Sequence, residues 1–192
     1  MNLIPLLYQT PPEWAATACH DFNHFLLDHA SCERKASAVG LSFVVRYPDR
    51  TKIIEPMIQF AREELEHFHQ VTRLCLERGL NLIPDEPDEY VNRIMKAVRF
   101  GREERFLDRL LTSALIEARG AERLGLVAQH LSEEKLKHFY ARLARAEGAH
   151  HHFFLEMASH YFPEDTIDNR LHELIAIENE AIRSVPFRSA LH

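Results

Sequence analysis

The sequence predicts an all-α fold, a four-helix bundle with additional flanking helices, in a single domain over residues 1–192. Glycine and proline are scarce, at six and nine residues, so long uninterrupted elements are expected. Apolar residues recur at spacings of three and four over long segments, as on one face of a helix. No segment shows strand alternation or an Asn-Gly hairpin signal. Long helices joined by short turns are typical of antiparallel bundles.

The first half of the chain carries clear helix boundaries. Thr10 and the two prolines after it begin a helix that is expected to reach about residue 46. Tyr47 and Pro48 stop it, and Asp49 is expected to cap the next helix, over about 51–78. Gly79 ends that helix.

The second half continues the pattern. A shorter helix is expected over about 88–100, and Gly101 separates it from a long one over about 102–130. Ser132, with two glutamates behind it, is expected to cap a helix over about 133–161. Pro163 breaks the chain before a last helix over about 166–184.

Composition excludes several classes of protein. Apolar residues make up 46% and charged residues 27%, as in ordinary globular domains. No apolar run approaches the roughly 20 residues of a membrane span, and 1–8 lack the basic start of a signal peptide. The chain has only three cysteines, and they lie far apart in the sequence, at Cys19, Cys32 and Cys75. An odd number at such spacings argues against a disulfide framework or a zinc knuckle. A reduced, cytoplasmic location is therefore expected.

An internal repeat carries the first sign of metal chemistry. Residues 61–69 align without gaps on 144–152, and five of the nine positions match. Each copy contains E-x-x-H, as Glu64 with His67 and Glu147 with His150. Residues three apart lie on one face of a helix, so each carboxylate and imidazole could bind one metal ion together. The repeat also predicts two helical hairpins of similar plan.

The neighbours of these pairs predict that they face the core. In the first copy the stripe through Glu64 and His67 is otherwise apolar, and it contains Ile53, Met57, Phe60, Val71 and Leu74. The stripe through Glu147 and His150 is similar, with Leu136, Tyr140, Leu143, Phe154 and Met157. Three other candidates share polar faces and are expected at the surface, namely Glu66, His69 and His152. His151 stays open, because it could reach a site near Glu147.

A ferritin-like di-metal site also needs one glutamate from each of the other two long helices. Glu33 is the candidate on the first, and Glu117 or Glu122 on the fourth. Glu117 lies on an apolar stripe and is 14 residues before Leu131, while Glu147 is 16 after it. Glu122 is only nine residues before Leu131. It would therefore lie about 10 Å along the bundle axis from the level of Glu147, so we interpret Glu122 as structural.

The donor set indicates which metals would fit. Four carboxylates and two imidazoles at one level of a core are costly unless cations compensate them. Carboxylate-rich ligation with imidazole and without thiolate suits iron or manganese rather than structural zinc. Magnesium and calcium prefer all-oxygen shells. The pattern therefore predicts a carboxylate-bridged pair of metal ions, with iron as the expected metal.

Several segments together resemble a known family. They are residues 28–36, 61–69, 116–123 and 146–153, with the tail 186–188. In these segments and in length, the chain is similar to the bacterial tRNA 2-methylthio-N-isopentenyl-adenosine hydroxylases. E-x-x-H alone is shared with ferritins and with ribonucleotide reductase small subunits, so the Cys32-Glu33-Arg34-Lys35 context narrows the resemblance.

The resemblance implies an activity and a ligand set. A non-haem di-iron centre would use dioxygen to hydroxylate the isopentenyl side chain of the modified adenosine 3′ of the anticodon. Partners would be the tRNA anticodon stem-loop and an external electron donor, a reductase or a ferredoxin, because the chain has no flavin, nicotinamide or iron–sulfur motif. No membrane partner is expected. The implied ligands are Glu33, Glu64, His67, Glu117, Glu147 and His150.

Two other functions remain open at this point. One is a di-iron oxidase or monooxygenase acting on a small molecule, and the other is an iron store. The store is disfavoured because it would need a large cage, which nothing in the sequence requires.

Any RNA contact must use a local patch, because the net charge is −6. The most basic window holds six cations within seventeen positions, namely Arg93, Lys96, Arg99, Arg102, Arg105 and Arg109. It could bind phosphates, although a solvated helix face with ion pairs is the favoured interpretation. Phe100 and Phe106 could stack on bases, although core positions are favoured for both.

Small residues surround the predicted ligands. These residues are Ala30, Ser37, Gly40, Ala114 and Ala121. They either leave room for a prenyl group or allow close helix packing, and the sequence favours neither interpretation.

Overall fold

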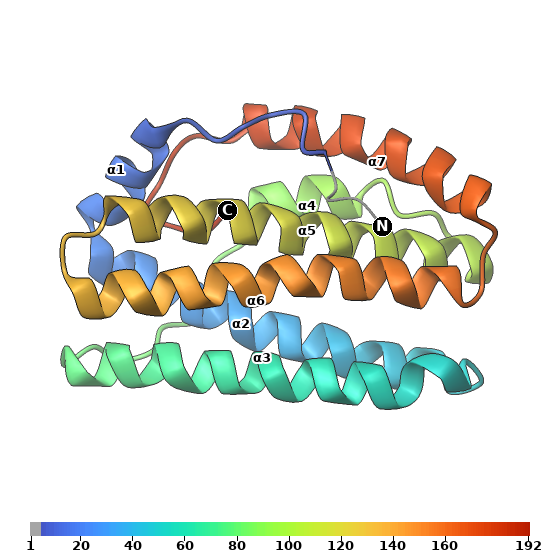
Figure 1. The fold of residues 1–192 in the computed structure, drawn as a ribbon, viewed down its shortest axis with the longest axis horizontal. Coiled ribbons are helices and arrows are strands. Elements are labelled where there is room, and N and C mark those ends of the chain that lie inside the picture. The colour runs from blue at the N-terminus through green and yellow to red at the C-terminus, as the bar shows by residue number, and fades with distance from the viewer. Residues whose placement is uncertain (1–4) are drawn as a thin grey trace. The chain divides into compact units, whose positions relative to one another are not determined.

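The computed structural model describes residues 5–192. This range forms helices and no strand, which confirms the all-α prediction (Figure 1). The helices are α1 (Pro12–His20), α2 (Phe22–Arg46), α3 (Thr51–Glu77), α4 (Glu89–Met95), α5 (Arg102–His130), α6 (Glu134–Ser159) and α7 (Glu164–Ser184). Within 5–192, every helix is too short or too polar to cross a membrane. The expectation about a signal peptide in 1–8 lies partly outside the described residues.

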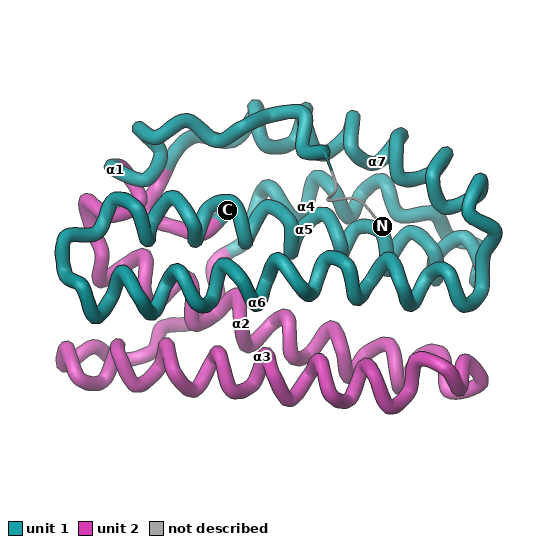
Figure 2. Tube along the Cα trace, viewed as in Figure 1, with its two compact units in different colours: residues 1–16, 87–187, 192 teal, residues 17–86, 188–191 magenta. Residues whose placement is uncertain are grey.

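The chain forms two compact units (Figure 2). Of the described residues, unit 1 contains 5–16, 87–187 and 192, and unit 2 contains 17–86 and 188–191. Unit 1 is therefore discontinuous in sequence. The expectation of one domain over 1–192 stays a prediction.

Unit 2 is built on α2 and α3, an antiparallel pair that packs side by side along its length (Figure 1). The turn between them closes with the Tyr47 amide donating to Phe43 O (3.0 Å) and the Arg50 amide to Tyr47 O (3.0 Å). Gly79 follows α3 with a φ of 72°, a left-handed conformation that glycine adopts without strain, so its predicted role in ending α3 is confirmed.

Two boundary predictions in unit 2 are wrong. The first helix is not continuous to residue 46, because Asp21 interrupts it and its side chain accepts a hydrogen bond from the His24 amide (3.0 Å). This carboxylate caps α2 and separates it from α1. Asp49 does not cap α3, since Arg50 occupies the cap position and makes no side-chain cap hydrogen bond.

The helices α2 and α3 approach each other closely at Gly40. A Cβ atom placed there would lie 2.8 Å from Cδ1 of Phe60 and 3.0 Å from the carbonyl oxygen of Met57. One turn earlier, Ser37 Oγ donates to Ala61 O (2.8 Å). At these two positions the small side chains serve close packing.

Unit 1 is built on α5 and α6, joined by the short turn 131–133, with α7 packed against α5 and α4 (Figure 1). Tyr90 and Ile94 of α4 form a buried cluster with Ala181 and Ile182 of α7. Ser132 does not cap α6, because Glu133 is the cap residue and makes no side-chain cap hydrogen bond.

Helix α4 is shorter than predicted and ends at Met95 instead of about residue 100. The segment after it, the α4–α5 linker (residues 96–101), is bound by α5 and α7. Arg170 Nη2 donates to Ala97 O (2.8 Å), and the Arg99 amide donates to Asp108 Oδ2 (2.9 Å). These long-range hydrogen bonds replace the helical ones that residues 97–100 would otherwise make.

Candidate metal centre

Unit 2 brings three of the predicted ligands together. Glu33 comes from α2, and Glu64 and His67 come from α3. Nδ1 of His67 lies 3.7 Å from Glu33 Oε2 and 3.5 Å from Glu64 Oε2. Both glutamates are buried and the histidine is 13% exposed, which agrees with the predicted core-facing stripe.

His29 is a residue of this group that sequence reasoning missed. It is fully buried on α2, one turn before Glu33, and its Nε2 lies 2.5 Å from Glu33 Oε1. Burial opposes ionisation of Glu33, but His29 and then His67 outweigh it and hold the pKa of Glu33 below its ordinary value of 4.5. The i, i+4 spacing of His29 and Glu33 was the available signal.

Unit 1 brings the other three predicted ligands together. Glu117 comes from α5, and Glu147 and His150 come from α6. Nδ1 of His150 lies 4.0 Å from Glu117 Oε2 and 4.0 Å from Glu147 Oε2. All three side chains are buried. Each unit therefore brings together one E-x-x-H pair of the internal repeat and one further glutamate of the predicted ligand set.

The other glutamate and histidine side chains of the two repeat copies differ in their exposure to solvent. Glu66 and His69 are 60% and 63% exposed, so their surface assignment is confirmed. His152 is half-buried instead of fully at the surface. His151 is buried, and burial lowers the pKa of its imidazole to about 4.

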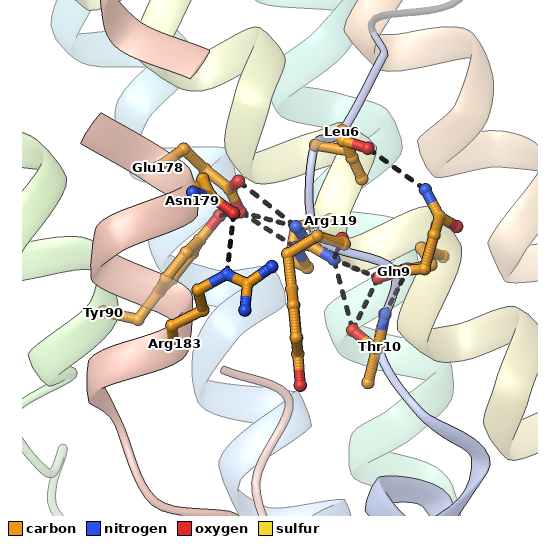
Figure 3. A network of polar contacts seen from close by, with 10 residues as sticks. Leu6, Gln9, Thr10, Tyr90, Arg119, Glu178, Asn179 and Arg183 are labelled. Atoms are coloured by element: carbon orange, nitrogen blue, oxygen red, sulfur yellow. Dashed lines mark hydrogen bonds and ion pairs between the residues drawn. The ribbon is translucent and has the colours of Figure 1, made fainter. Parts of the chain in front are cut away.

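Glu122 belongs to a polar network of unit 1. Its carboxylate accepts hydrogen bonds from the amide and the hydroxyl of Thr10, both at 2.7 Å, and it pairs with Arg119. Figure 3 shows Arg119 between Thr10 and Glu178, and its Nε lies 2.9 Å from Glu178 Oε1. Tyr90 donates its hydroxyl to the same oxygen (3.0 Å). These contacts agree with a structural role for Glu122.

The geometry of each three-residue set fits a metal ion. Nitrogen–oxygen distances of 3.5 to 4.0 Å are longer than hydrogen bonds. Two atoms that bind one ion at about 2 Å each lie at most about 4 Å apart. In each unit the three side chains offer ligand atoms within 4.8 Å of one another. Carboxylates with imidazole and without thiolate are compatible with iron.

The predicted basic window has both exposed and bound members. Exposed cations at the end of α4, in the linker and at the start of α5 are Arg93, Lys96, Arg99 and Arg102. Arg99 also forms an ion pair with the buried Asp108 (2.8 Å). Phe106 is fully buried as expected, but Phe100 is 91% exposed, so the core prediction for Phe100 is wrong. The early end of α4 accounts for the difference.

Comparison with known proteins identifies the family. The family model for tRNA-(MS2IO6A)-hydroxylase (MiaE) matches residues 3–192. The chain belongs to this family.

Two curated relatives carry the same name, tRNA 2-(methylsulfanyl)-N(6)-isopentenyladenosine(37) hydroxylase. The protein from Pseudomonas putida is 36% identical over 189 residues, which are 96% of this chain and 92% of the relative. The protein from Salmonella typhimurium is 32% identical over 133 residues, which are 69% of this chain and 48% of the relative.

A solved structure is also similar to this MiaE family member. It is protein 43 with aldehyde deformylating oxygenase activity from Synechococcus, at 32% sequence identity and a TM-score of 0.92. The match covers 100% of this chain and 96% of that chain. This likeness confirms the predicted ferritin-like fold class.

Proposed function

We propose that this protein hydroxylates the isopentenyl side chain of 2-methylthio-N-isopentenyl adenosine, the nucleoside 3′ of the anticodon in tRNA, with dioxygen as co-substrate. The family match over residues 3–192 carries this proposal. The two relatives named as hydroxylases of this nucleoside support the substrate. A tRNA substrate also agrees with a cytoplasmic location. We further propose that both units belong to one catalytic domain over residues 1–192.

The proposed metal ligands are the six side chains that the sequence singles out. One trio, Glu33, Glu64 and His67 of unit 2, would supply half of the donor set. The other trio, Glu117, Glu147 and His150 of unit 1, would supply the other half. Two iron ions bound by them would supply the activation of dioxygen. Electrons would come from an external donor, a reductase or a ferredoxin.

The remaining side chains prepare the ligands. His29 fixes one oxygen of Glu33 and leaves the other facing His67, so the carboxylate is oriented before metal binds. Apolar residues are buried on the same helices as the ligands, and they include Leu26, Phe60, Leu143 and Phe154. Apolar surroundings suit a reaction at an allylic C–H bond, because side reactions with water are suppressed.

A second candidate function is a di-iron monooxygenase or oxidase for a small molecule. The observation that favours it is the likeness to a solved structure named for aldehyde deformylating oxygenase activity. The family match and the curated relatives favour the tRNA substrate instead.

Isotope labelling separates these functions. Purified protein is loaded with iron and given a reductant, labelled dioxygen and tRNA that carries the prenylated adenosine. The expected result is one labelled oxygen atom in the side chain of that nucleoside. Consumption of dioxygen that yields only peroxide or water indicates an oxidase or a store. Equal reaction of the free nucleoside and the anticodon stem-loop would replace the tRNA proposal with a small-molecule monooxygenase.

A further inference from the structure

The α4–α5 linker displays an aromatic ring that the fold of unit 1 does not use. Phe100 is 91% exposed, the highest value among the large apolar side chains that the structure leaves at the surface. The neighbouring aromatic Phe106 is fully buried, so the linker separates one ring for the core from one for the solvent. A protruding phenylalanine offers both faces of its ring to a partner.

The backbone on which Phe100 stands is fixed. The buried carboxylate of Asp108 accepts three hydrogen bonds from Arg99, from its amide (2.9 Å), its Nε (3.0 Å) and its Nη2 (2.8 Å). Arg170 of α7 donates two more to the same carboxylate and one to Ala97 O. Ala97 and Arg99, which precede Phe100, are thus bound to α7 and α5, so Phe100 is presented without loss of much loop entropy on binding.

The charge around Phe100 suits an anionic partner. Between residues 96 and 105 four cations stand against two glutamates, in a protein of net charge −6. Lys96 and Arg102, which precede and follow Phe100 in the sequence, are both exposed, as are the acids Glu103 and Glu104. An exposed aromatic ring between cations is the combination by which proteins bind single-stranded RNA, since the ring stacks on a base and the cations bind flanking phosphates.

We propose that Phe100 stacks on an unpaired base of the tRNA substrate, with Lys96 and Arg102 binding adjacent phosphates. The inference rests on the proposed function, because it takes tRNA as the substrate. The distance from Arg102 to the predicted ligand Glu117 fits the size of an anticodon stem-loop. Glu117 lies 15 residues after Arg102 on the same helix, about 22 Å along its axis. That length corresponds to about six or seven stacked nucleotides.

The test uses the iron-loaded full chain and a synthetic anticodon stem-loop that carries the prenylated adenosine. Four variants are compared, namely Phe100→Ala, Phe100→Leu, Phe100→Tyr and the control Leu76→Ala at an exposed apolar position of α3. Phe100→Ala and Phe100→Leu are expected to raise the Kd for the stem-loop about tenfold or more. Phe100→Tyr and Leu76→Ala are expected to bind as the wild type does, and turnover of the free nucleoside is expected to be unchanged in all four.

Several outcomes would overturn the inference. The first is an unchanged Kd for the stem-loop in Phe100→Ala. The second is wild-type binding by Phe100→Leu, because that result would indicate an apolar contact without stacking. Normal RNA binding with slower turnover only when a protein electron donor replaces a chemical reductant would assign Phe100 to that protein instead. If the wild type neither binds nor hydroxylates the stem-loop, the proposed function fails as well, whereas an active wild type with an unaffected Phe100→Ala variant rejects the stacking alone.

Discussion

Glu33 illustrates how a buried carboxylate stays charged. Its desolvation favours the neutral acid, but His29 and His67 provide stronger stabilisation of the anion. The same pairing explains why glutamates can lie on an otherwise apolar stripe that faces the core. A charged side chain in a core needs neighbours of opposite charge or hydrogen-bond donors, and those neighbours lie at helical spacings.

Glu117 and Glu122 should respond differently to the same substitution. Glu117→Gln is expected to reduce bound iron from two ions per chain, because it removes one carboxylate from the buried set of unit 1. Glu122→Gln is expected to keep two irons, since its partners are Thr10 and Arg119. Metal analysis after anaerobic iron loading checks both. The reverse result would mean that the ligand has been assigned to the wrong residue of α5.

Asp108 should make stability depend on pH in the acid range. Burial opposes its ionisation, but hydrogen bonds from Arg170 and Arg99 outweigh this and hold its pKa below the ordinary 3.8. A lowered pKa in the folded state means that the ionised carboxylate stabilises the protein above pH 3.8, and that this contribution is lost as pH falls through the folded-state pKa.

Asp108→Asn is therefore expected to be less stable than the wild type near neutral pH and to lose less on acidification below about pH 4. Urea unfolding at several pH values measures both slopes. Parallel curves for the two proteins would show that Asp108 does not carry this dependence.

At the scale of elements, the contact between α2 and α3 depends on a missing side chain. Gly40→Ala gains about 1 kcal/mol of helix propensity but introduces a methyl group 3.0 Å from the Met57 carbonyl oxygen. Overpacking costs about 1–3 kcal/mol, so a net loss of about 1 kcal/mol in the free energy of unfolding is expected. Chemical denaturation gives the value.

Gly125 in α5 is the matched control for this substitution. A Cβ atom there meets nothing within 4 Å, so Gly125→Ala should stabilise the protein by up to about 1 kcal/mol. Equal effects of the two substitutions would show that crowding at Gly40 is relieved by local movement.

The elements could largely be predicted from the sequence, because caps, breaks and apolar stripes are local signals. Long helices were located within a few residues, and the residues of each predicted ligand trio were brought together. The break at Asp21 was missed because an aspartate within a helical pattern is also common on solvated faces. The early end of α4 depends on Arg170, about 70 residues away, and no local window contains that information.

At the scale of the whole molecule, iron should stabilise the folded protein through the proposed ligands. Loss of one ligand is therefore expected to lower both the iron content and the stabilisation that iron gives. Glu64→Ala is expected to lower the iron content below two ions and to abolish most of the rise in Tm on iron loading. In the wild type that rise reflects a stabilisation of about 2.7 kcal/mol when free iron is 100 times Kd. Calorimetry with and without iron measures this.

Glu66→Ala is the control, because it removes a glutamate from the exposed face of the same helix. It should keep two irons and the full rise in Tm. One iron retained by Glu64→Ala with an unchanged rise in Tm would show that the two trios bind metal independently.

The discontinuity of unit 1 also sets an order of events during synthesis. Residues 17–86 of unit 2 are complete well before unit 1, whose Thr10 must wait for Arg119 and Glu122. At roughly 5 to 20 residues per second, the ribosome needs roughly 3 to 13 s more to reach His150. During this interval the nascent hairpin of α2 and α3 carries Glu33, Glu64 and His67 without the second trio. The trio of unit 1 is therefore the later of the two to form.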